Sequence, residues 1–251
     1  MKVILCLILL FPAAARAGTP KYSAVDGALA VPLSEDNSYF RNPANPAYDY
    51  WNLSGYYMPQ AGGSSCSAAS VSMALNALLN ARRQRGDDEE NIAEEKLVEK
   101  VSGVPWQALV STEGADGRHG LTLAQLAAVS KEALAGYGAA EFSVTSVPAS
   151  THSVQAMENF RRALAENERN PQNIMLLHFA QDTLTGAPGG PYAHISPVGA
   201  YDERTRRVLV FDVDRQWYEP YWAADVQVFK AMFVKTGAFG RGGYVLLKAI
   251  K

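Results

Sequence analysis

Residues 60–78 read QAGGSSCSAASVSMALNAL, which places Cys66 between a Gly/Ser turn and an apolar stretch. Small and apolar residues recur after it at spacings of three and four, which predicts an amphipathic or buried helix over residues 66–84. Ser64 or Ser65 is expected to supply the N-cap. A thiol in the first turn of a helix lies among backbone N–H groups without intrahelical acceptors, and this setting favours the reactive thiolate. Cys66 is thus a candidate nucleophile; a buried small hydrophobe and half of a disulfide are the competing interpretations.

The N-terminal segment MKVILCLILLFPAAARAGT has the pattern of a secretory signal. A lysine precedes an apolar run over residues 3–11, and Ala15-Arg16-Ala17 has the form that signal peptidase accepts. The apolar run is too short to remain as a membrane anchor. We therefore expect residues 1–17 to be cleaved near Ala17-Gly18. The remaining residues 18–251 are expected to form one catalytic domain, periplasmic or secreted, with no membrane contact.

The second cysteine, Cys6, lies inside this segment, so its cleavage leaves Cys66 alone and excludes an internal disulfide. No Cys-x-x-Cys or paired-histidine spacing is present, and we expect no metal site. The formal net charge is −2, and no basic stripe interleaved with aromatic residues occurs. Nucleic acid is therefore not an expected partner.

Periodicity changes along the chain from helical to extended. Further helices are predicted over residues 88–101, 121–134 and 153–168, and β-strands over residues 173–180, 194–202, 207–214 and 242–250. Residues 18–60 are rich in Pro, Asn, Tyr and Gly, which predicts an ordered coil. The connection YDERTRR predicts a hairpin that makes two of the strands antiparallel neighbours. Helices followed by an antiparallel sheet indicate an α+β fold, with the Cys66 helix packed on the sheet.

A cysteine nucleophile needs a base, and His194 is the candidate among four histidines. His119 and His152 lie in polar loops and are interpreted as exposed, whereas His178 lies between apolar residues and is interpreted as a core residue. His194 opens a strand after a flexible Gly/Pro loop. It follows Cys66 by 128 residues, close to the roughly 130–150 that separate cysteine and histidine in papain-type enzymes.

Asp212 is an acid in the apolar strand LVFDVD, and a buried acid needs a partner. His194 on the adjacent strand is the natural one, which gives a candidate Cys66–His194–Asp212 triad. Gln60, six residues before Cys66, is placed to donate its amide N–H to an oxyanion. Two alternatives stay open at this point: a core cysteine with an unrelated surface histidine, and Asp212 with Asp214 as a metal-binding pair.

Three blocks, QAGGSSCSAASVSMALNAL, HISPVGAYD and VFDVDRQWYEPYW, together resemble the N-terminal catalytic domain of phytochelatin synthases, in particular the short bacterial forms. The resemblance covers roughly residues 35–250. The matched positions are Gln60, Cys66, Ala69, Ser70, Met73, Leu75, Asn76, Ala77 and Leu78 in the first block; His194, Ser196, Pro197, Gly199 and Tyr201 in the second; and Asp212, Val213, Arg215, Tyr218, Pro220 and Trp222 in the third.

The resemblance implies a papain-like fold and an enzyme that acts on glutathione. Cys66 would attack the Cys–Gly bond, release glycine and retain a γ-glutamylcysteinyl thioester, with Gln60 stabilising the oxyanion. The acyl group would pass to water or to the amine of a second thiol peptide, with hydrolysis favoured. No cofactor is implied, and Cd²⁺ or Zn²⁺ would enter only within a metal-thiolate substrate. The partner is a small molecule, glutathione or a γ-Glu-Cys peptide, and a homodimer is left open.

The resemblance also implies substrate contacts: Arg241 for the γ-glutamyl carboxylate, with Arg215, Tyr218 and Ala193 as further candidates. The chain departs from the family pattern at nearby positions, which are Trp217 for Lys, Glu219 for Pro, Ala193 for Gly, His178-Phe179-Ala180-Gln181 for Asn-Tyr-x-Arg, and the segment 233–240, which lacks an acidic residue. Two alternatives to glutathione cleavage therefore remain: a papain-like peptidase for another small peptide, and a non-catalytic thiol- or metal-binding protein.

Overall fold

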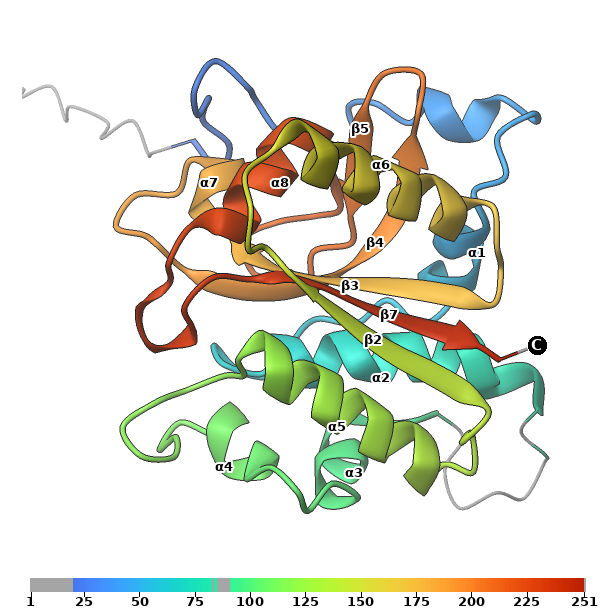
Figure 1. The fold of residues 1–251 in the computed structure, drawn as a ribbon, viewed down its shortest axis with the longest axis vertical. Helices are drawn as coiled ribbons and strands as arrows, with labels where there is room; N and C mark the ends of the chain where they lie inside the picture. The colour runs from blue at the N-terminus through green and yellow to red at the C-terminus, as the bar shows by residue number, and fades with distance from the viewer. Residues whose placement is uncertain (1–19, 83, 85–90, 251) are drawn as a thin grey trace, which may run out of the picture.

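A seven-stranded antiparallel sheet forms the centre of the computed structural model, which describes residues 20–82, 84 and 91–250 (Figure 1). The predicted signal peptide lies outside these residues. The strands, in the order β1-β6-β5-β4-β3-β7-β2 across the sheet, are β1 (Val31–Pro32), β2 (Phe142–Pro148), β3 (Asn173–Ala180), β4 (Ala193–Asp202), β5 (Arg207–Val210), β6 (Tyr221–Ala224) and β7 (Gly243–Ala249).

Helices cover both faces of this sheet. They are α1 (Tyr48–Ser54), α2 (Cys66–Leu79), α3 (Glu94–Glu99), α4 (Trp106–Val110), α5 (Leu123–Gly136), α6 (Val154–Glu168), α7 (Asp182–Thr185) and α8 (Asp225–Phe233), with short 3₁₀ turns η1 (Ser38–Arg41), η2 (Asn80–Arg82) and η3 (Gly237–Phe239). Figure 1 shows α2 to α5 on one side of the sheet and α6 and α8 on the other. The predicted α+β class is confirmed.

Strand β3 explains why two helical layers form. All eight of its residues are buried, and successive side chains of a strand point to opposite faces. Ile174 and Leu176 join the core beneath α2, whereas Met175 and Leu177 join the core with α6 and α8. A strand that is apolar on both faces needs a cover on each, and the helices supply it.

Local sequence sets several helix boundaries. Thr122 caps α5 and forms a capping box with Gln125, so this helix begins two residues after its predicted start. The predicted helix over 88–101 is shortened to α3, as far as the structure describes it. The Asn76 side-chain amide donates to the Ile92 carbonyl and accepts from the Ile92 N–H. These backbone groups of Ile92 therefore bind a side chain and not another turn of a helix.

Other predictions were incomplete. The coil expected over 18–60 contains β1, η1 and α1 in its described part, and β2, β6, α4 and α8 were not predicted. The strand expected over 207–214 ends at Val210, the last residue that pairs with β6. The hairpin at residues 201–207 is confirmed, since Asp202 pairs with Arg207.

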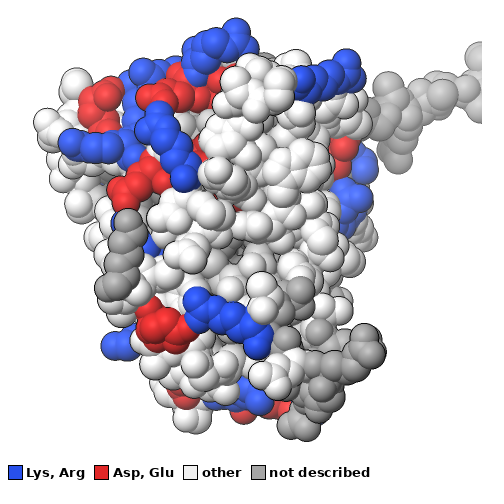
Figure 2. All heavy atoms as spheres, turned by 90° about the vertical axis from the view of Figure 1, so that its right-hand side faces the viewer, with Lys and Arg blue, Asp and Glu red and all other residues white. Residues whose placement is uncertain are grey.

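The surface carries both signs of charge. On the side that faces the viewer in Figure 2, acidic and basic side chains lie next to one another rather than gathering by sign. Ion pairs such as Arg169–Glu203 and Lys248–Glu166 are of this kind. None of the helices in the described part of the chain is long and apolar enough to cross a membrane.

A buried glutamate joins the N-terminal segment to the sheet. Glu168, at the end of α6, accepts hydrogen bonds from Tyr39 Oη at 2.7 Å, the Ala47 N–H at 2.9 Å and the Tyr201 N–H at 2.8 Å. Burial raises its pKa from 4.5 to about 7, although these three donors act in the opposite direction.

This shift predicts a pH-dependent stability. A carboxyl group whose pKa is raised by folding binds protons more tightly in the folded state, so stability falls as pH rises from about 4.5 to about 7. We expect Glu168→Gln to remove up to about 3 kcal/mol of this decrease. Urea unfolding between pH 5 and 8 measures it. The exposed Glu166→Gln is the matched control and should keep the wild-type slope; equal slopes in wild type and Glu168→Gln would contradict the assignment.

Candidate active site

Cys66 is the first residue of α2 and is 8% exposed. The carbonyl of Ser65 accepts the N–H of Ala69 at 3.0 Å, so the helical ladder starts at Ser65. The Ser65 hydroxyl binds the backbone of Gly62 at 3.0 and 3.2 Å instead of a helical N–H. The predicted N-cap therefore closes the preceding turn, and the first N–H groups of α2 remain directed toward the space before the helix.

Two serines of α2 fix its position relative to the sheet and to α4. Ser70, one turn after Cys66, donates to the carbonyl of Ile195 at 2.9 Å. Ser67 accepts the indole N–H of Trp106 at 2.9 Å. Ile195 follows His194 directly, so the bond from Ser70 connects the helix that carries Cys66 to the strand that carries His194.

His194 stands at the start of β4 and is 5% exposed. Its Nε2 lies 2.8 Å from Asp212 Oδ1 and 3.0 Å from Ser196 Oγ. Nδ1 is thus the ring nitrogen left for Cys66, which lies close enough to the imidazole to contribute to the rise of its pKa. The structure brings the three residues of the sequence-predicted triad together.

Asp212 reaches His194 because the chain continues beside β4 after β5 ends. The Phe211 N–H binds the Pro197 carbonyl at 2.9 Å, and the Val213 N–H binds Ser196 Oγ at 3.3 Å. Gly199 makes this approach feasible. A Cβ at Gly199 would stand 2.2 Å from the Phe211 ring, and the register between β4 and β5 shifts at this residue.

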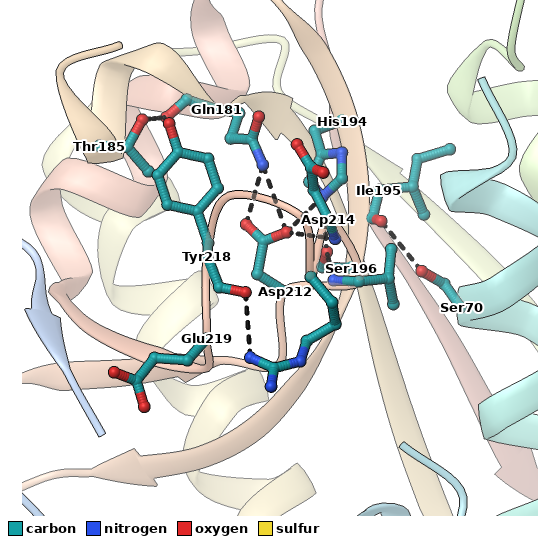
Figure 3. A network of polar contacts seen from close by, with 12 residues as sticks. Ser70, Gln181, Thr185, His194, Ile195, Ser196, Asp212, Asp214, Tyr218 and Glu219 are labelled. Atoms are coloured by element: carbon teal, nitrogen blue, oxygen red, sulfur yellow. Dashed lines mark hydrogen bonds and ion pairs between the residues drawn. The ribbon is translucent and has the colours of Figure 1, made fainter. Parts of the chain in front are cut away.

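Gln181 is a site residue that sequence reasoning did not assign. Its amide donates to both carboxylate oxygens of Asp212, at 3.2 and 3.0 Å (Figure 3). The Asp214 N–H adds a third donor at 2.9 Å. A fully buried carboxylate requires such partners. Two signals were available: a glutamine directly after an apolar strand, and the departure from the family pattern at Gln181.

The pKa shifts describe an ion pair. Burial alone would lower the pKa of His194, but the charge and hydrogen bond of Asp212, with a smaller effect of Cys66, hold it well above its usual range. Burial would raise the pKa of Asp212, but His194, Gln181 and the Asp214 N–H lower it. An ion-paired histidine beside a cysteine at the start of a helix is an arrangement that supports nucleophilic attack on a carbonyl.

Gln60 lies in the loop before α2 and is half-buried. Its backbone N–H donates to the Val213 carbonyl at 2.9 Å. The Tyr57 hydroxyl, three residues earlier, donates to the Asp212 carbonyl at 2.5 Å. These bonds hold the loop against the segment that carries the triad acid, and the Gln60 side chain lines the same cavity as Cys66.

A cavity of about 690 Å³ opens over these residues. This volume suits a small-molecule substrate. Ala193 and Tyr218, two predicted substrate contacts, line it together with Cys66 and His194. His119 and His178 line it as well, although His178 is 1% exposed and its Nε2 lies 2.9 Å from the Leu121 carbonyl, as expected of a core histidine.

Two predicted substrate contacts lie elsewhere. The Arg215 guanidinium lies 5.1 Å from the centre of the Tyr57 ring and donates to the Tyr218 carbonyl at 3.2 Å. The Arg241 guanidinium lies 5.5 Å from the centre of the Phe233 ring. Neither arginine is among the residues that line the cavity. Within the described ranges, no group of three or more His, Cys, Asp or Glu residues is placed to hold a metal ion.

Comparisons with known proteins agree with this geometry. The family model described as phytochelatin synthase matches residues 30–242. A glutathione gamma-glutamylcysteinyltransferase from Schizosaccharomyces pombe is 31% identical over 94 residues. That alignment covers 37% of this chain and 22% of the relative, so the chain matches only a part of the longer protein.

The ion pair predicts how Cys66 labelling depends on Asp212. In Asp212→Asn the charge that raises the pKa of His194 is lost while burial, which lowers it, remains. The imidazolium then deprotonates at a lower pH, and we expect iodoacetamide to label Cys66 at pH 6 about 10-fold more slowly than in the wild type. Mass spectrometry of the labelled protein gives the rate. The exposed Asp116→Asn is the control, and an unchanged rate in Asp212→Asn would contradict the pairing.

The contact of Gln181 with Asp212 predicts a stability cost. Gln181→Leu leaves the buried carboxylate with fewer donors, and we expect the free energy of unfolding to fall by about 1–3 kcal/mol. Gln107→Leu, at an exposed position of α4, should change it by no more than about 0.5 kcal/mol. Urea unfolding at pH 7 compares the two; similar small changes in both would show that Gln181 does not support Asp212.

Proposed function

The chain belongs to the phytochelatin synthase family, and we propose that it cleaves the Cys–Gly bond of glutathione through a thioester on Cys66. The contact of His194 with both Asp212 and Cys66, at the wall of a cavity of small-molecule size, is the observation that supports this proposal. The triad supplies a nucleophile, an acid–base group and an orienting carboxylate.

Acylation starts from the Cys66 thiolate and the His194 imidazolium. The sulfur attacks the carbonyl carbon of the cysteinyl residue, and a C–S bond forms as the carbonyl oxygen becomes negative. In this proposal the Gln60 amide and the backbone N–H groups at the start of α2 stabilise this oxyanion. The C–N bond then breaks, and the imidazolium Nδ1 gives its proton to the departing amine of glycine. The enzyme is left with a γ-glutamylcysteinyl thioester and a neutral histidine.

Deacylation reverses the proton path. An acceptor, water or the amine of a second thiol peptide, gives a proton to Nδ1 as it attacks the thioester carbonyl. The C–S bond breaks, and the thiolate–imidazolium pair returns. Asp212 holds Nε2 throughout, so the imidazole keeps Nδ1 toward the reacting atoms.

We favour water as the acceptor, because the cavity offers few cations to a second anionic peptide. Arg215 binds Tyr57 and Tyr218, and Arg241 lies against Phe233. Where the family pattern has a lysine, this chain has Trp217, which lines the cavity and is 55% exposed. The aromatic rim of Trp217 and Tyr192 also supports a second candidate function, a peptidase for another small peptide.

Export is part of the proposal and rests on the signal pattern of residues 1–17, which lie outside the described structure. A heavy-metal ion, where one takes part, is proposed to arrive as part of a metal-thiolate substrate. Cell fractionation, and product analysis with and without Cd²⁺ or Zn²⁺, test these two points.

Product analysis with glutathione tests the proposed function. We expect wild-type protein to release glycine and γ-Glu-Cys, and Cys66→Ser or His194→Ala to reduce the rate by about 10³-fold or more. The exposed His152→Ala is the matched control and should retain the wild-type rate. Mass spectrometry follows both products, and any longer γ-Glu-Cys peptide reports transfer instead of hydrolysis.

Other outcomes separate the alternatives. Glycine release that is unchanged in Cys66→Ser would refute the thioester mechanism. Release from a peptide library but not from glutathione would favour the peptidase. No turnover of any thiol peptide, free or metal-loaded, would favour a non-catalytic thiol-binding protein.

A further inference from the structure

Residues 20–28, here called the N-terminal strap, run along α7 toward the active-site cavity. The Ser23 N–H donates to the Thr185 carbonyl at 2.8 Å. The Gln227 amide joins the strap to α7 by donating to the Val25 carbonyl at 3.4 Å and to the Thr183 carbonyl at 3.0 Å. The strap is therefore fixed to the body of the protein on both sides of Ser23.

The fit of the strap against α7 is close. At Gly186, which ends α7 with φ +72°, a Cβ would stand 2.5 Å from the Ser23 carbonyl oxygen. Next to Ser23, the ring of Tyr22 packs edge-on against Tyr218 and Tyr221, with centroid distances of 5.4 and 5.7 Å. Tyr218 lines the cavity, so these contacts determine where the preceding residue lies.

That preceding residue is Lys21, which lines the active-site cavity together with Pro20. Among the described residues that line the cavity, Lys21 is the one Lys or Arg and Asp214 the one Asp or Glu. The Lys21 side chain is exposed, and within the part of the chain that the structure describes it forms no ion pair. Residues 20–28 also lie outside the region matched by the family model, which begins at residue 30.

We propose that Lys21 is a specificity-determining residue that binds a carboxylate of the substrate. The proposal rests on the proposed function, because glutathione carries two carboxylates, while Arg241, the residue expected to bind the γ-glutamyl carboxylate, is not among the residues that line the cavity. An ammonium on a flexible stem suits this role, since it reaches a carboxylate without a fixed geometry. A cation at the wall of a cavity also raises the local concentration of an anionic ligand.

An alkylation experiment tests Lys21 independently of the natural substrate. Iodoacetate and iodoacetamide alkylate the same Cys66 thiolate, but only iodoacetate carries a carboxylate. We expect Lys21→Gln to slow iodoacetate by about 3- to 10-fold at low salt and to leave iodoacetamide within about 2-fold. The iodoacetate effect should shrink at 0.5 M NaCl, because salt screens an exposed charge.

Lys131→Gln, on the exposed face of α5, is the matched control and should leave the ratio of the two rates unchanged. A ratio that is also unchanged in Lys21→Gln would overturn the proposal. Equal slowing of both reagents would overturn it too, because that result means a structural disturbance of Cys66 and not loss of a carboxylate contact.

Glycine release provides the second measurement. We expect Lys21→Gln to raise KM for glutathione by about 3- to 10-fold with kcat within about 2-fold, as for loss of a contact that ground state and transition state share. An unchanged KM would overturn the assignment for glutathione. If the wild type releases no glycine, the proposed function fails, and the alkylation ratio still decides whether Lys21 binds a carboxylate.

Discussion

The carboxylate of Asp212 is the group on which the site depends, because a fully buried charge is tolerated only with several partners. Each partner comes from a different part of the chain: His194 from β4, Gln181 from the end of β3, and the Asp214 N–H from its own turn. The backbone of the same segment accepts hydrogen bonds from Tyr57 and from the N–H of Gln60. Satisfying one buried acid therefore brings the base, the nucleophile loop and the sheet into one arrangement.

The contacts of the site that could be predicted are those whose two residues lie in elements adjacent in the sequence. His194 opens β4, and Asp212 lies two residues after β5, the strand joined to β4 by a short hairpin, so sequence spacing alone placed them together. Gln181 binds Asp212 across 31 residues, and nothing in its neighbourhood specifies that partner. For Arg241, the motif gives the position of the residue, but the direction of its side chain depends on the backbone of the preceding loop, where Gly240 has φ +70°.

The same reasoning applies to the fold. Long periodic segments such as α2 and β3 were predicted because burial of one face or of both faces dictates their pattern. The α1 helix was missed because seven residues are too few for intrinsic helix stability; packing of Leu53 in the interior stabilises it, and the Asn167 amide donates to the buried Asp49 carboxyl group. Strand β6 and α8 were missed because they follow one another without a turn between Ala224 and Asp225. The hydrophobic pattern of a strand, with a period of two, therefore runs directly into that of a helix, and neither is long enough to be recognised.

The triad lies on or next to regular elements, whereas loops form much of the cavity wall. In the proposed mechanism Cys66, His194 and Asp212 make and break the thioester, and they are held by α2, β4 and a segment bonded to β4 and to the loop before α2. The cavity wall that an acceptor meets is built from the loop 186–193, the turn 214–218 and the N-terminal strap, and loops are where related proteins differ most. A change of acceptor needs no change in the triad. Of the departures of this chain from its family pattern, Ala193 and Trp217 fall on those segments, whereas the triad residues are kept. On the proposed function, this distribution is the one expected of an enzyme that retains the first half-reaction and alters the second.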